Sequence, residues 1–183
     1  MRGEGIPAHC SRRTAHTRSV LTLLTVLVAQ SIPAARLAGA EITFDARATV
    51  ADFQGRTTVA TGTLEWVEVR WRDIDTKNGT RNRHMLRTVQ EERFPVIRFD
   101  LTGATGDTGQ VRLKGSLTLH GVSQPVEWPA VVRVDADSLS VAADFPVDMR
   151  DYGIKPPVRF VIARMGAVVM VHVRLVFVRE GAQ

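Results

Sequence analysis

Apolar and polar residues alternate over much of the chain after residue 40. Ile42, Phe44, Ala46 and Ala48 share one face of such a segment, and the same period recurs over residues 111–119 and 169–177. A period of two predicts β-strands with one buried face and one more exposed face. Further strand candidates lie at 57–63, 64–72, 96–101, 126–134, 138–145 and 158–163. Short strands at regular spacing favour an antiparallel sandwich or barrel.

One stretch has a different period. Residues 81–93 are polar, with Met85, Leu86 and Val89 at helical spacing, and Phe94-Pro95 follows them. This spacing predicts one short amphipathic helix that ends before the proline.

The first forty residues have the order of a secretory signal peptide. Four arginines precede an apolar run at 20–28, and the small residues Ala38-Gly39-Ala40 follow it. This order predicts cleavage after Ala40, a mature domain at 41–183 and a periplasmic or secreted location. A retained signal-anchor helix is the alternative. However, the apolar run is shorter than the roughly 20 residues of a membrane span, so we expect no stable span after cleavage.

Charge and cysteine content narrow the classes of partner. The chain has 24 basic and 19 acidic residues. Residues 1–40 hold five of the basic residues and one of the acidic ones, so residues 41–183 hold 19 basic and 18 acidic residues. A nearly neutral domain lacks the basic surface that nucleic-acid binding needs, so no nucleic-acid partner is expected. The single cysteine, Cys10, precedes the apolar run, so no disulfide is expected in the domain.

The pattern by itself does not separate a filled sandwich from a barrel with a lumen. Small residues stand at inward positions of the expected strands, including Ala46, Gly115 and Ala143. Small inward residues leave room for a ligand, unless neighbouring phenylalanine and tryptophan rings fill it. Both interpretations stay open at this level.

Three segments, in order, resemble motifs of the YceI-like family of polyisoprenoid- or lipid-binding proteins. Residues 81–85 (RNRHM), followed by 94–99 (FPVIRF), resemble the family's helix and the Pro-x-Ile-x-Phe strand after it. Residues 115–126 (GSLTLHGVSQPV) are similar to its G-x-L-T-x-x-G-x-x-x-P-V run. Residues 148–154 (DMRDYGI) are similar to its R-x-D-aromatic-G signature.

The resemblance implies an antiparallel, lipocalin-like β-barrel with one short helix and an apolar lumen that holds an isoprenoid or fatty-acyl chain. Two positions depart from the family pattern. Gln124 and Met149 stand where basic residues are common, so the resemblance does not carry over a basic site for an anionic head group. The family's usual opening run is also absent.

We therefore predict a binding protein for a long apolar molecule or lipid, without catalytic activity or cofactor. The expected lumen residues are Phe44, Phe53, Phe99, Leu101, Leu117, Phe145, Tyr152, Ile154, Phe160 and Val171. The alternative is a filled-core envelope protein that acts through protein–protein contacts in envelope stress or assembly. The sequence leaves a homodimer open.

No pattern predicts catalysis or metal binding. His84, His120 and His172 lie on distant segments without the paired spacing of metal ligands. A G-x-S-x-G nucleophile motif is absent. We expect no catalytic residue and no metal site.

Overall fold

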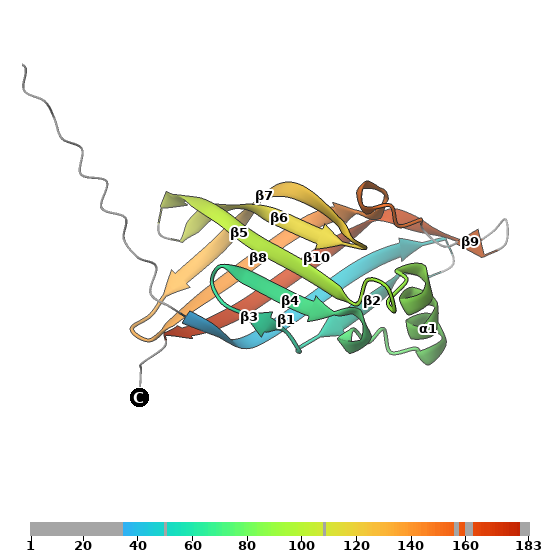
Figure 1. Ribbon diagram of the computed structural model, residues 1–183, viewed down its shortest axis with the longest axis horizontal. Helices are drawn as coiled ribbons and strands as arrows, with labels where there is room; N and C mark the ends of the chain where they lie inside the picture. The colour runs from blue at the N-terminus through green and yellow to red at the C-terminus, as the bar shows by residue number, and fades with distance from the viewer. Residues whose placement is uncertain (1–34, 50, 108, 156–157, 160–162, 180–183) are drawn as a thin grey trace, which may run out of the picture. The chain divides into compact units, whose positions relative to one another are not determined.

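The alternating segments form one antiparallel sheet (Figure 1). The computed structural model describes residues 35–49, 51–107, 109–155, 158–159 and 163–179. In this part of the chain the strands are β1 (Ala35–Ala48), β2 (Phe53–Thr57), β3 (Thr61–Gly62), β4 (Trp66–Arg70), β5 (Val96–Asp107), β6 (Gln110–Leu119), β7 (Val122–Val134), β8 (Ser138–Asp148), β9 (Val158–Arg159) and β10 (Ala163–Arg179).

The sheet has the order β2-β1-β10-β8-β7-β6-β5-β4-β3, and β9 pairs only with β10. It curls until its edges come together at isolated bridges. Arg36 of β1 pairs with Thr63, just after β3, and Arg56 of β2 pairs with Asp75. The expected antiparallel, lipocalin-like sheet with one short helix is thus confirmed.

The helix α1 (Gly79–Thr88) lies at the end of the sheet where β1 ends (Figure 1). It starts two residues before the expected range because the Asn78 side chain caps it, accepting a hydrogen bond from the Arg81 backbone N–H at 2.9 Å. It stops before the expected end because Gln90 adopts a left-handed conformation with φ of 49°. Two 3₁₀ turns, η1 (Trp71–Asp73) and η2 (Met149–Tyr152), complete the fold.

Two hairpins connect β5, β6 and β7. β5 continues through the glycine-containing residues 103–107 before β6 begins. By contrast, β6 and β7 meet in a tight turn at His120 and Gly121, with φ values of 50° and 75°. Two successive positive φ values match the right-handed twist of a hairpin, so this turn fixes the register of β6 and β7.

Strands β7 and β8 separate along half of their length. β7 pairs with β6 over residues 122–131 but with β8 only from Ala130 onwards. Pro125 and Pro129 lie in the separated half, where a proline cannot donate a ladder hydrogen bond. Gln124 bridges to η2, because its side-chain amide donates to the Asp151 carbonyl at 3.0 Å. Gln124, which stands where the family commonly has a basic residue, thus helps to hold η2 in place.

The first six residues of β1 belong to the folded sheet. They pair with β10 between Leu175 and Arg179, and Ala35 is buried beside Leu175 and Phe177. The Arg36–Thr63 bridge also lies in this segment. Signal-peptide cleavage after Ala40 stays a prediction, and it would remove this part of β1; residues 1–34 lie outside the described part of the chain.

We expect a chain that begins at Glu41 to be less stable than one that begins at Ala35. It loses the strand pairing and the apolar cover of Leu175 and Phe177, at a cost of at least about 2 kcal/mol, comparable to a large-to-small core substitution. Urea unfolding of the two chains measures the difference. Equal midpoints and slopes would show that Ala35–Ala40 adds nothing to the fold.

His172 joins three strands on the outer face of the sheet. Its Nδ1 lies 2.8 Å from an Asp144 oxygen of β8, and its Nε2 lies 3.1 Å from an Asp45 oxygen of β1. The hydrogen bond with Asp144 is the main cause that raises the pKa of His172. Partial desolvation lowers this pKa, and the hydrogen bond with Asp45 raises it further. The pKa of Asp144 is lowered, chiefly by Arg174, and that of Asp45 chiefly by Gln54.

The stabilisation by His172 should therefore depend on pH. Because its folded-state pKa is raised, the contribution is complete below the unfolded value of 6.5 and is lost as pH rises through the folded value. We expect wild type to have a higher Tm than His172→Gln below pH 6.5, with the difference shrinking at higher pH. An equal difference at pH 5.5 and pH 9 would contradict a charge effect.

Candidate functional site

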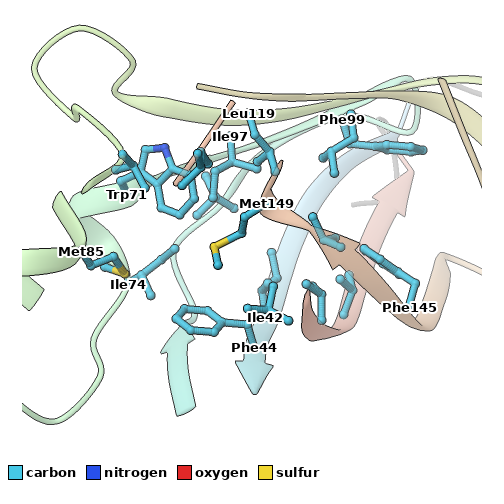
Figure 2. A pocket seen from close by; sticks show the side chains of 18 of the residues that line it. Ile42, Phe44, Trp71, Ile74, Met85, Ile97, Phe99, Leu119, Phe145 and Met149 are labelled. Atoms are coloured by element: carbon cyan, nitrogen blue, oxygen red, sulfur yellow. The ribbon is translucent and has the colours of Figure 1, made fainter. Parts of the chain in front are cut away.

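An apolar cavity of about 570 Å³ lies inside the curled sheet. Its wall comes from the inward faces of the strands and from η1, α1 and η2. Figure 2 shows Trp71, Ile74 and Met85 toward one end and Phe99 and Phe145 toward the other, with Met149 between them. The sheet and the helix thus enclose a space that this protein's own side chains do not fill.

The cavity extends along much of β10. Its wall includes residues of this strand from Met165 to Leu175. Because β10 is the longest strand of the sheet, the apolar lining spans a large part of the sheet's inner face.

Side chains fill one end of the curled sheet, and exposed residues border the cavity at the other end. At the first end, the buried cluster of Ala35, Leu175 and Phe177 packs against Leu64, Val67 and Leu139. At the other end the wall includes Thr49 and Ala51, which are exposed, and residues of α1. The mouth therefore lies between α1 and the lining residues Ala48, Thr49 and Ala51.

Three aromatic rings stack along one wall. Trp128 and Phe145 have ring centroids 3.6 Å apart and planes at 10°, and Phe99 stacks on the other side of Trp128 with centroids 5.8 Å apart. Trp128 and Phe145 come from β7 and β8, which share no ladder at this level. The stack therefore packs the two strands together where hydrogen bonds do not.

Small inward residues have two different roles. A Cβ at Gly115 would overlap the Phe99 ring, and one at Gly55 would overlap the Phe44 ring. Glycine is needed at both positions because a ring lies against the backbone. Ala143, in contrast, borders the cavity. The expectation that small residues leave room fits Ala143, whereas at Gly55 and Gly115 rings occupy the room.

Seven of the ten expected lumen residues line the cavity. They are Phe44, Phe53, Phe99, Leu117, Phe145, Ile154 and Val171.

The other three expected residues are placed differently. Leu101 is half-buried at the register shift between Leu101 and Gly103, and an irregularity of this kind disturbs the regular alternation of side chains. Tyr152, also expected in the lumen, is buried in η2 and lines a separate pocket between β7 and β8. Burial raises the pKa of its phenol, which therefore stays neutral. Phe160 lies outside the described residues.

Several lining residues were not expected from the sequence. Trp128 follows the inward alternation of β7, so that signal was present in the sequence. Met85 lies on the apolar side of the expected helix, but nothing in the pattern directs that side into a lumen. Trp71, Ile74 and Met149 come from turns, where no periodicity distinguishes inward from outward positions.

The sequence and the fold are similar to those of known proteins. The sequence profile of the YceI-like domain matches residues 34–177. The chain belongs to the YceI-like family. The match starts at the first described residues of β1, upstream of the expected domain start at Glu41. No curated protein matches the chain.

Solved YceI-like structures share the fold at low sequence identity. A polyisoprenoid-binding domain from Saccharophagus degradans, implicated in plant cell wall breakdown, has a TM-score of 0.68 at 17% identity, over 81% of this chain and 99% of its own. Burkholderia cenocepacia BcnA has a TM-score of 0.63 at 11% identity, over 75% and 95% of the two chains. A Campylobacter jejuni YceI protein has a TM-score of 0.51 at 14% identity, over 68% and 74%.

The described part of the chain contains neither a cluster of metal ligands nor a helix suited to cross a membrane. No group of three or more His, Cys, Asp or Glu side chains is placed to hold a metal ion there. No helix among those residues has the length and apolarity to cross a membrane.

We expect Phe145→Ala to destabilise the protein strongly. The ring is 7% exposed and stacks on Trp128, and removal of a buried phenylalanine ring typically costs about 3–5 kcal/mol. Phe145→Leu keeps part of the apolar volume and should cost less. Urea unfolding measures both changes, and a loss below about 1 kcal/mol for Phe145→Ala would show that the stack does not hold β7 to β8.

Proposed function

We propose that this YceI-like protein binds and carries one long apolar chain, of fatty-acyl or isoprenoid type, inside its lumen and catalyses no reaction. The observation that carries the proposal is the cavity of about 570 Å³ with an almost wholly apolar wall. A dry apolar channel favours hydrocarbon over water, because burial removes apolar surface from the solvent.

The volume gives the length of chain. A methylene group is close in size to a water molecule, which occupies about 30 Å³ in the liquid, so about 570 Å³ holds about 19 such groups. That is the size of a C16–C18 fatty-acyl chain or a C15–C20 isoprenoid. Burial of sixteen methylene groups contributes about 13 kcal/mol before the cost of association, which is enough to hold a lipid without a covalent bond.

The predicted signal peptide supports a periplasmic or secreted place of action, where a carrier would shield an insoluble chain from water. The alternative, a filled-core protein that acts through protein–protein contacts, has less support. Such a protein has no need of a cavity, whereas this one has a cavity of about 570 Å³.

A pair of substitutions on β10 tests the lumen. Val169 lines the cavity midway along β10, whereas Val168 faces outward and is 46% exposed. Because the added ring would project into the cavity, Val169→Phe should obstruct the tail and lower affinity for hexadecanol at least tenfold. Val168→Phe, the same change on the opposite face, should leave the affinity within twofold.

Binding can be followed by tryptophan fluorescence and native mass spectrometry of delipidated protein. Trp71 and Trp128 line the lumen, whereas Trp66 lies under the Arg98 guanidinium. Urea unfolding should confirm that Val169→Phe folds, since overpacking typically costs about 1–3 kcal/mol. Absence of saturable binding of any C12–C20 chain by wild type would overturn the proposed function.

A further inference from the structure

The polar side chains in the wall of the lumen gather at its mouth. Apart from the indoles of Trp71 and Trp128, the lining residues that carry polar side chains are Thr49, Arg81, His84 and Thr88. Thr49 follows β1, and the other three lie on α1. The rest of the wall is apolar, down to the closed end near Leu175. A ligand that matches this wall has one polar end and one apolar tail.

The charge at this mouth is positive. The helix α1 carries Arg81, Arg83 and Arg87 and contains no acidic residue. Nearby carboxylates have other partners. Asp75 pairs with Lys77 and Glu91 with Arg72, and Asp52 accepts a hydrogen bond from the Ala48 backbone N–H. Within the described part of the chain, no carboxylate lies within ion-pair distance of Arg81.

Two contacts hold the Arg81 guanidinium in place and leave most of its N–H donors unused. Its guanidinium carbon lies 4.4 Å from the centroid of the Phe53 ring, which itself lines the lumen. One nitrogen, Nη1, donates to the Thr76 carbonyl at 3.2 Å. A guanidinium has five N–H donors, so most of them stay available to an incoming group at the mouth. Planar, paired N–H groups suit carboxylate and phosphate oxygens.

We propose that the ligand is an amphiphile whose single tail fills the lumen and whose anionic head, a carboxylate or a phosphate, binds Arg81 at the mouth. This inference rests on the proposed function, because it needs the tail in the lumen. It adds a substrate class and an orientation: the tail enters first, and the head stays beside α1, Thr49 and Ala51.

Three ligands with the same C16 tail test the head group: palmitate, hexadecyl phosphate and hexadecanol. Wild type should bind at least one of the two anionic ligands at least tenfold more tightly than hexadecanol, and comparison of these two distinguishes a carboxylate from a phosphate. Arg81→Gln should lower the affinity for the preferred anion about tenfold and leave that for hexadecanol within twofold. Arg83→Gln, on the exposed side of the same helix, should change neither.

Hexadecanol serves as the internal control for folding, because a damaged lumen would weaken all three ligands together. Equal loss for all three in Arg81→Gln would assign Arg81 a structural role and overturn the proposal. Equal affinity of wild type for the three ligands would also overturn it, while the proposed binding of a long chain would stand. If no C16 ligand binds to wild type, the proposed function itself fails.

Discussion

The apolar inward face of the curled sheet is the constraint on which the rest of the structure depends. A sheet whose inner side is apolar from Ile42 to Leu175 must exclude water along that side. Curling accomplishes this by bringing the sheet's edges together at two isolated bridges. The curl leaves a channel wherever the inward side chains do not reach one another. In this fold, the cavity is the part of the core that side chains do not fill.

β10 organises the sheet around this channel. It runs for 17 residues and pairs with β1 on one side and β8 on the other. Its inward residues follow the channel from Met165 to Leu175, whereas its outward side carries the His172 cluster. One long strand therefore sets the length of the lumen. The opposite side is less regular, because β7 and β8 are held partly by the ring stack of Trp128 and Phe145.

Much of the fold could be predicted from the sequence because it follows from local periodicity. The alternation at 42–48, 111–119 and 169–177 identified strands, and helical spacing around Met85 identified α1. Phe44, Leu117 and Val171, which were expected in the lumen from the same alternation, line the cavity. Leu101, beside a register shift, and Tyr152, in the η2 turn, lie where periodicity is interrupted and are not among the lining residues.

The sequence by itself determined which side chains share a face, because neighbours two apart on a strand point the same way whatever the strand packs against. It also determined the resemblance to the YceI-like family, whose motifs lie in α1, at the β6–β7 turn and in η2. Only the tertiary structure decided that the interior is hollow. Whether Gly115 leaves room or receives the ring of Phe99 depends on how far apart β5 and β6 hold their side chains. Likewise, only the curl of the whole sheet brings Arg81 of α1 to the mouth of a channel whose far end lies near Leu175.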